Sequence, residues 1–251
     1  MSTNKKAVLA IENLLSRQEY MVYQGNDLAK AFGGLSSFEQ RVLDYCFSFV
    51  KKEDKAREVY EVTVLEIIKH FGLNTSGQNY QRIAAAFKRL NENTALYLPV
   101  RRDDGTRGIR LTQLFSMIDF YVDGAVRFRF SEDAAPLVFG LTKNFYSFHL
   151  WELSRIKGKY TLILLKLWEA KRSGNEVRTT IEAPVSEWQS WFLGTDKKVS
   201  NSRFYTSILN RAMEELELKL NIDCFLTSLK SGRKIVSYRL EILDKSKLVN
   251  S

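Results

Sequence analysis

The clearest pattern of hydrophobic and polar positions lies in the last third of the chain. Apolar residues recur at helical spacing over 183–194 and again over 203–218, and a basic, polar segment separates the two runs. Two segments of strand character follow over 220–229 and 233–242, joined by a short turn that contains glycine. A helix, a turn, a second helix and a two-stranded hairpin form the winged type of helix-turn-helix. The pattern therefore predicts a DNA-reading unit.

The helix predicted over 203–218 has one apolar and one polar side. The apolar side comprises Phe204, Tyr205, Ile208, Leu209, Ala212 and Leu216. The polar side begins with a cation, hydroxyls and an amide, which bond base edges and phosphates, and ends with carboxylates, which a DNA backbone repels. We expect the N-terminal end to enter a DNA groove, and an ordinary surface helix is the alternative. The predicted base-reading residues are Asn201, Ser202, Arg203, Thr206, Ser207 and Asn210.

The first half of the chain shows the same order of elements. Ser36 with Glu39, and Thr63 with Glu66, have the spacing of capping boxes at the start of two helices. Both starts are followed by apolar residues at helical spacing. The predicted elements are a helix over 36–50, a strand and helix over 60–72, a turn and helix over 74–93, and strands over 94–100, 109–122 and 126–133.

The helix predicted over 74–93 also has two sides. Its apolar side comprises Tyr80, Ile83, Ala86, Phe87 and Leu90. Ala85 lies at the centre of the polar side, where its small methyl group permits close approach to DNA. Arginine and glutamine make the commonest direct contacts to guanine and adenine, and a solvated charged face is the alternative. The predicted base-reading residues are Gln78, Asn79, Gln81, Arg82, Lys88 and Arg89.

Basic turns accompany both predicted reading helices. Long cations on a hairpin tip bind phosphates and carry little sequence information. A charged turn is usual for any hairpin, so the interpretation depends on its recurrence after each reading helix. The predicted phosphate-binding residues are Arg101, Arg102, Arg107, Lys197, Lys198, Lys230, Arg233 and Lys234.

The second half repeats the order of the first. A long helix over 155–174 corresponds to the helix over 36–50, and Glu187 takes the place of Glu66. We predict an α+β fold of two tandem winged-helix domains related by internal duplication, with residues 141–153 as connector. The predicted parts are an N-terminal arm (1–20), an N-terminal winged-helix domain (21–140) and a C-terminal winged-helix domain (141–251).

Composition and charge restrict the class of protein. The 251 residues are 45% hydrophobic and 12% aromatic, which excludes a disordered chain. No apolar run approaches the ~20 residues that span a bilayer, and the N-terminus lacks a secretory signal, so we predict a cytoplasmic protein. The formal charge of +9 and the pI of 9.4 favour nucleic acid as partner over a membrane surface. Cys46 and Cys224 are predicted to be buried free thiols.

Catalytic and metal-binding motifs are missing from the sequence. His70 and His149 are far apart and have no Cys, Asp or Glu nearby at metal-ligand spacing, so both are interpreted as structural. The chain also lacks a Walker A loop, GxGxxG and GxSxG. We predict no catalytic residue, no metal, no cofactor and no enzymatic activity.

Four segments carry a resemblance to a known family. They are QGNDLAKAF (24–32), LSSFEQRVLDY (35–45), KGKYTLILLKLWEAKR (157–172) and SEWQSWFLG with the helix after it (186–194). These segments are similar to the initiator proteins of iteron-containing, theta-replicating bacterial plasmids, of the F-plasmid RepE type. The resemblance covers about residues 20 to 245, as an ordered set of patterns and not as one sharp motif.

The resemblance implies a plasmid-encoded, cytoplasmic bacterial protein with two winged-helix domains. A monomer would bind repeated origin sites (iterons) in double-stranded DNA, and a homodimer in equilibrium with it would bind an operator and repress the protein's own gene. The monomer would open an AT-rich segment, recruit the host replication initiator, helicase and primase, and so control plasmid copy number. The family's major-groove contacts fall on the start of the helix over 203–218, which here has few arginines.

Two other classes compete with this interpretation. A plasmid or phage transcriptional regulator without an initiation role would also bind DNA, but seldom needs two different winged-helix units on one chain. A rolling-circle nickase would require paired histidines and an activated tyrosine, which the sequence does not show. The initiator is therefore the preferred hypothesis.

Overall fold

The computed structural model of the chain describes residues 21–141, 145–149, 153, 155–174, 176–195 and 197–250. The predicted N-terminal arm (1–20) lies outside the described residues, as do parts of the predicted connector.

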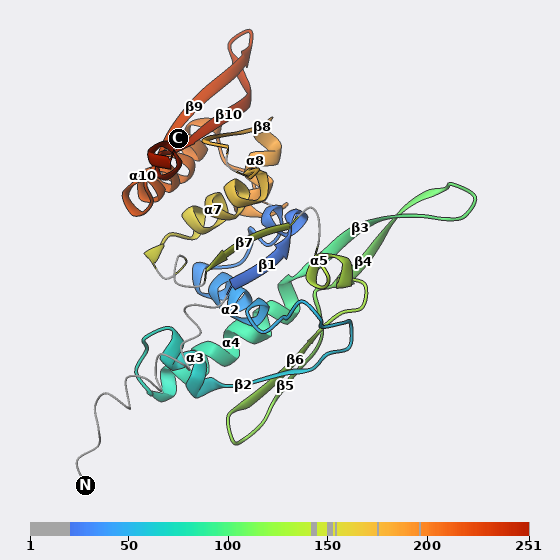
Figure 1. Cartoon of the computed structure of the whole chain (residues 1–251). Coiled ribbons are helices and arrows are strands. Elements are labelled where there is room, and N and C mark those ends of the chain that lie inside the picture. The colour runs from blue at the N-terminus through green and yellow to red at the C-terminus, as the bar shows by residue number, and fades with distance from the viewer. Residues whose placement is uncertain are drawn as a thin grey trace, which may run out of the picture.

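The chain forms two units of helices and small antiparallel sheets, which Figure 1 shows in blue to green and in yellow to red. The first contains β1 (Met21–Gly25), η1 (Asn26–Lys30), α2 (Ser37–Phe47), β2 (Tyr60–Thr63), α3 (Val64–His70), α4 (Gly77–Asn93), β3 (Ala95–Arg101), β4 (Arg107–Gln113), β5 (Phe115–Phe120), β6 (Ala125–Phe130) and α5 (Ala135–Val138). The second contains β7 (Phe145–His149), α7 (Lys159–Lys171), β8 (Arg178–Pro184), α8 (Val185–Leu193), α9 (Asn201–Phe204), η2 (Tyr205–Leu209), α10 (Asn210–Lys219), β9 (Ile222–Ser231), β10 (Lys234–Asp244) and η3 (Lys245–Asn250).

The two units share one topology. In each, a helix (α2 or α7) precedes a short strand (β2 or β8), further helices follow, and a hairpin completes a three-stranded sheet. The strand order is β2-β6-β5 in the first sheet and β8-β10-β9 in the second, with antiparallel neighbours throughout. The predicted repetition of helix, turn, helix and hairpin is therefore present in the structure.

The first unit contains two hairpins where the sequence analysis predicted one continuous strand over 109–122. Strands β3 and β4 pair with each other in a sheet distinct from that of β5 and β6. The segment 109–122, predicted as one strand, is divided at Leu114, which is fully buried. Its N–H donates to the carbonyl of Thr94 (3.0 Å), and its carbonyl accepts from the N–H of Ser131 (2.8 Å). The chain turns a corner there, so the wing that corresponds to β9–β10 is β5–β6, and β3–β4 is an addition after α4 (Figure 1).

Local sequence signals fix the starts of two helices. At α2 the Glu39 N–H donates to Ser36 Oγ (3.3 Å) and the Ser36 N–H donates to Glu39 Oε2 (2.7 Å). At α3 the same reciprocal bonds join Thr63 and Glu66 (3.2 and 2.6 Å). Both predicted capping boxes are confirmed, and each cap contributes on the order of 1 kcal/mol to helix stability.

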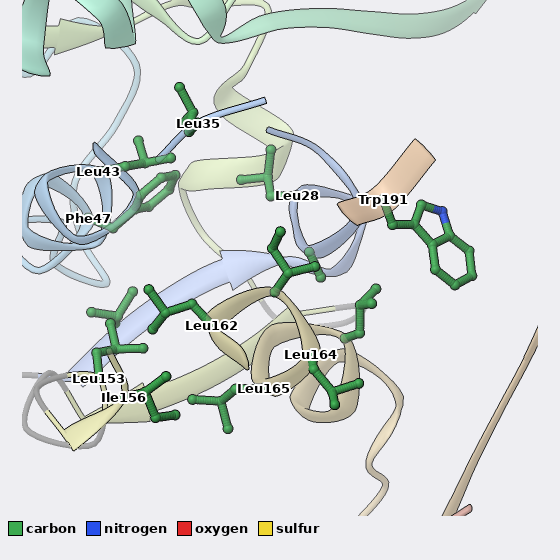
Figure 2. Close-up of a cluster of buried hydrophobic side chains, with 14 of the residues drawn as sticks. Leu28, Leu35, Leu43, Phe47, Leu153, Ile156, Leu162, Leu164, Leu165 and Trp191 are labelled. Atoms are coloured by element: carbon green, nitrogen blue, oxygen red, sulfur yellow. The ribbon is translucent and has the colours of Figure 1, made fainter. Parts of the chain in front are cut away.

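Helix α7 is buried between the two units. Every residue from 161 to 168 is buried, so this helix is covered on all sides and not along one face only. Strand β7, which precedes it, pairs with β1 at the start of the first unit. Figure 2 shows part of the shared core, with Leu28, Leu43 and Phe47 from the first unit, Leu162, Leu164 and Leu165 from α7, and Trp191 from α8. The predicted domain boundary at residue 140 stays a prediction, since β7 and α7 contact elements before it.

A buried polar network fastens α7 to the first unit. Lys166 Nζ lies 2.7 Å from Asp44 Oδ1 of α2, with the two side chains 7% and 0% exposed. Gln24 of β1 donates to the same oxygen (2.8 Å), and the Tyr146 hydroxyl of β7 donates to Gln24. Burial raises the pKa of Asp44, while the charge of Lys166 and the hydrogen bonds from Lys166 and Gln24 lower it. The network joins four elements at one carboxylate.

We predict that Lys166→Ala lowers the free energy of unfolding by about 3–5 kcal/mol, because it leaves the Asp44 carboxylate buried without its cation. Urea unfolding monitored by circular dichroism measures this value. Lys171→Ala, at the exposed end of the same helix, is the control and should change stability by less than about 0.5 kcal/mol. Equal stability of the two variants would contradict the role given to the network.

Candidate nucleic-acid interface

Helix α4 presents the predicted polar face to solvent. Ile83, Ala86, Phe87 and Leu90 are buried, as the apolar pattern predicts, and Ala85 is exposed. Tyr80 was predicted on the apolar side but is 37% exposed, because it lies at the edge of that side near the start of the helix. The predicted base-reading residues that are exposed are Gln78, Gln81, Arg82, Lys88 and Arg89.

Contacts with α2 and within α4 hold several of these side chains. The Arg82 guanidinium lies over the Phe38 ring, 3.9 Å from its centroid, which orients its outer edge. Arg89 Nε lies 2.9 Å from Glu39 Oε1, so part of its charge is neutralised. Asn79 is half-buried and donates to Asn74 at 2.8 Å, so its amide serves the helix start. Arg82 and the two glutamines are therefore better placed than Asn79 or Arg89 for base contacts.

The second reading helix consists of α9, η2 and α10 in one continuous run. Ser200 caps its start by accepting from the Arg203 N–H (3.3 Å). The segment η2 is a π-helical turn. At about 100° per residue an ideal α-helix would place Phe204 and Met213 on opposite sides, yet both are buried. The wider π turn between them takes up this drift and keeps one face against the core.

This π turn explains one error in the predicted face. Tyr205 was placed on the apolar side but is 41% exposed, whereas Phe204, Ile208 and Leu209 are buried. Tyr205 therefore adds an aromatic ring to the polar surface. The predicted residues that are exposed along it are Ser202, Arg203, Thr206 and Ser207.

The two asparagines of this helix are half-buried and hydrogen-bonded inside the protein. Asn201 Nδ2 donates to the carbonyl of Ile235 in β10 (3.2 Å), which fixes the helix start on the wing. Asn210 Nδ2 donates to Glu214 Oε1 (2.6 Å). Both amides already have partners, so the polar surface of this helix consists mainly of the exposed hydroxyls and Arg203.

The predicted phosphate-binding cations are all exposed but lie in three separate places. Lys197 and Lys198 precede α9, and Lys230, Arg233 and Lys234 lie at the tip of the β9–β10 wing. Arg101, Arg102 and Arg107 lie at the tip of β3–β4, which extends from the C-terminal end of α4 (Figure 1). The tip of β5–β6, the true wing of the first unit, instead carries Tyr121 and Val122, which are 44% and 111% exposed.

A groove of ≈ 690 Å³ runs between the two units. The last turns of α4 and the first residues of β3 line one side, and Leu193, Gly194 and Lys197 line the other. Lys159 at the start of α7 is half-buried near Lys197. Burial lowers the pKa of Lys159, the charge of Lys197 lowers it further, and Glu39 raises it. No sequence signal marks Lys159, because only the fold brings it near Lys197.

Glu215 attaches the second reading helix to α7. Its carboxylate accepts from the backbone N–H groups of Lys157 (2.8 Å) and Gly158 (3.1 Å) and from the Thr161 hydroxyl (2.6 Å). Burial by itself raises the pKa of Glu215, but these hydrogen bonds outweigh it and leave the pKa below its ordinary value. A carboxylate from α10 thus caps the N-terminus of α7.

His70, which was interpreted as structural, packs against aromatic rings in the core. His70 is buried with its ring against Tyr45 and Phe71, at centroid distances of 4.6 and 4.8 Å. The His149 side chain lies outside what the structure describes. Cys46 is buried and Cys224 half-buried, and both are free thiols. In the described part of the chain no cluster of three or more His, Cys, Asp or Glu is arranged for a metal ion, and no helix there is long and apolar enough to cross a membrane.

Comparison with protein families decides the class of the chain. Residues 21–169 match the family described as "Initiator Replication protein, WH1", and residues 184–242 match "Initiator Rep protein, WH2". The chain belongs to the initiator replication protein family. The first match includes β7 and most of α7, and the second begins at the end of β8. The predicted α+β fold of two winged-helix domains and the family resemblance are confirmed. The RepE type is not distinguished by these matches and stays a prediction.

One solved structure supports the fold of this initiator, and a second is similar at a lower score. The Pi initiator protein, in a crystal structure with iteron DNA, superimposes with a TM-score of 0.69 over 90% of this chain and 98% of that chain, at 17% identity. Domains 2 and 3 of RctB match with a TM-score of 0.42 at 13% identity, over 83% of this chain and 79% of that chain. A search of the curated proteins finds no match.

We predict that Glu215→Gln reduces the acid sensitivity of the protein. A lowered pKa in the folded state stabilises the protein above the ordinary pKa of about 4.3, and this stability disappears as the pH falls through the lowered pKa. Between about pH 5 and pH 3 the wild type should therefore lose more stability than the variant. Urea midpoints at each pH measure the difference, with the exposed Glu187→Gln as control. Parallel curves for wild type and Glu215→Gln would refute the capping role.

Proposed function

We propose that this initiator binds repeated sites in a plasmid origin through both winged-helix domains, as a sequence-specific, non-enzymatic DNA-binding protein. The observation that carries the proposal is the pair of reading helices, α4 and α9–α10, each with an exposed polar face at its N-terminal part. The Pi initiator, which has a similar fold, is seen with iteron DNA. Each domain would place its helix in the major groove of one half of a repeat.

The proposed base-reading surface consists of side chains that are exposed and able to bond base edges. WH1 offers Gln78, Gln81 and Arg82, and WH2 offers Arg203 with neighbouring hydroxyls. Lys197, Lys198 and the cations of the β9–β10 tip would bind phosphates beside the second helix. The β3–β4 tip would bind phosphates farther along the duplex.

Initiation would follow from binding several repeats at once. The proposal includes opening of an AT-rich segment, recruitment of the host initiator, helicase and primase, and repression of the protein's own gene by a homodimer in equilibrium with the monomer. Under the same proposal the protein is cytoplasmic and is encoded by the plasmid. A transcriptional regulator without an initiation role is the second candidate, since winged-helix domains serve both.

A replication assay separates the two candidates. A plasmid whose sole origin is the non-coding DNA beside the gene should replicate when the wild-type protein is supplied. Footprinting on the same DNA should reveal protected repeats. Protection of an operator without any replication would favour the regulator.

We predict a strong dependence of binding on salt. About six to ten phosphate contacts spread over two domains should cost roughly three to five decades of affinity between 50 and 200 mM salt. Fluorescence anisotropy with a duplex repeat measures the slope. Removing two of the three cations at the β9–β10 tip, with Arg233→Ala and Lys234→Ala, should reduce the slope and leave sequence preference unchanged. A nearly flat dependence in the wild type would rule out contact by both domains.

We predict that the two reading helices determine different bases. Arg82→Ala and Arg203→Ala should each lose roughly 1–3 kcal/mol of binding free energy and relax sequence choice, at positions about one helical turn apart. Selection of bound duplexes from a randomised repeat, followed by sequencing, measures the preference of each variant. Lys171→Ala, at the exposed end of α7 and outside the predicted base-reading and phosphate-binding residues, is the control and should not change the preferred bases. Relaxation at the same base pairs in both variants would contradict the arrangement.

A further inference from the structure

The backbones of the two domains approach each other closely at a glycine. Gly33 follows η1 in WH1, and a Cβ added there would lie 2.3 Å from the carbonyl oxygen of Trp191 at the end of α8 in WH2. It would also lie 3.1 Å from the N–H nitrogen of Gly194. Any side chain at Gly33 would therefore force the backbones apart, because the nearest atoms belong to backbone and cannot rotate away.

The chain on both sides of this contact adopts conformations that favour glycine. Phe32, directly before Gly33, has φ +63°, which is rare for a bulky residue, and Gly194 has φ +85°. Strain of this kind persists where surrounding structure holds it and is concentrated at functional positions. A turn bond from the Leu35 N–H to the Phe32 carbonyl (2.9 Å) closes the WH1 side.

Only one short segment separates this contact from the reading helix in each domain. In WH1, Gly33 and Gly34 lead into the capping box of α2, whose Glu39 holds Arg89 of α4. In WH2, Gly194 ends α8 and begins the turn that leads to α9. The groove between the domains, lined by α4 on one side and by Leu193, Gly194 and Lys197 on the other, also includes Gly33 and Gly34 in its lining. Displacement at Gly33 would therefore change the separation of the reading helices.

We propose that the contact of Gly33 with the end of α8 sets the distance between the two reading helices, and so selects the spacing between the two halves of a DNA site. Half-site spacing on DNA is a geometric property of how two reading units are joined. Gly33 is thus a positioning residue that touches no DNA. The inference rests on the proposed function, since it requires both domains to read one site.

Gly34 offers a matched control one residue away. A Cβ added at Gly34 meets nothing within 4 Å, so Gly34→Ala adds the same methyl group to open space. The experiment compares wild type, Gly33→Ala and Gly34→Ala. Each binds a series of duplex repeats in which the segment between the half-sites is shortened by one base pair, unchanged or lengthened by one base pair.

Wild type and Gly34→Ala should bind the site with natural spacing at least about fivefold more tightly than the lengthened site. This difference is comparable with the cost of one mismatched base pair in a site. Gly33→Ala should lose this preference or bind the lengthened site better, while circular dichroism and unfolding midpoints confirm its fold. A spacing profile of folded Gly33→Ala identical to that of Gly34→Ala would overturn the inference and leave the proposed function intact. Failure of the wild type to bind any repeat would refute the proposed function itself.

A second variant acts from the other side of the contact. Trp191 is buried beside Trp188, and Lys30 of η1 lies over its ring at 5.4 Å. Trp191→Ala should loosen the contact and broaden the spacing preference without shifting it. If Gly33→Ala does not fold, this variant decides: a spacing profile as narrow as that of the wild type would overturn the inference.

Discussion

Burial of α7 between α2 of WH1 and α10 of WH2 is the constraint on which the placement of both proposed reading helices depends. Its residues from 161 to 168 have no exposed face, so separating the domains would expose apolar side chains at roughly 1.5–3 kcal/mol each. Polar contacts join this helix to α2 on one side and to α10 on the other. Lys166 holds Asp44 of α2, and Thr161 with the backbone of Gly158 holds Glu215 of α10. The two proposed DNA-reading surfaces are therefore parts of one packed body.

This arrangement gives the polar residues of the reading faces two kinds of role. Arg89 and Asn201 have partners on neighbouring elements and attach the helices to them, whereas Asn210 is bonded to Glu214 of its own helix. Arg203 and the hydroxyls of Ser202 and Ser207 lie exposed. Hydrogen bonds and ion pairs at the margin of such a face keep its exposed side chains in defined positions. Direct recognition of bases requires side chains that are positioned in this way.

Much of the fold could be predicted because it depends on local patterns. The capping boxes at Ser36 and Thr63 need only neighbouring residues, and apolar spacing located the reading helices. The corner at Leu114 could not be predicted, because its backbone partners lie 17 and 20 residues away in the chain and the alternating pattern continues across it. The same is true of Lys159 and Gly33. Their importance comes from residues that are distant in the chain, which no local pattern contains.

The paired burial of Asp44 and Lys166 also has a consequence for the evolution of the family. Loss of either charge alone leaves the other in an apolar core, whereas replacement of both by apolar residues of similar volume is close to neutral. Single substitutions at these positions would be removed by selection, and double ones would persist. Among initiators that share this helix arrangement, the residues at the two positions should therefore covary, either as an acid with a base or as two apolar side chains.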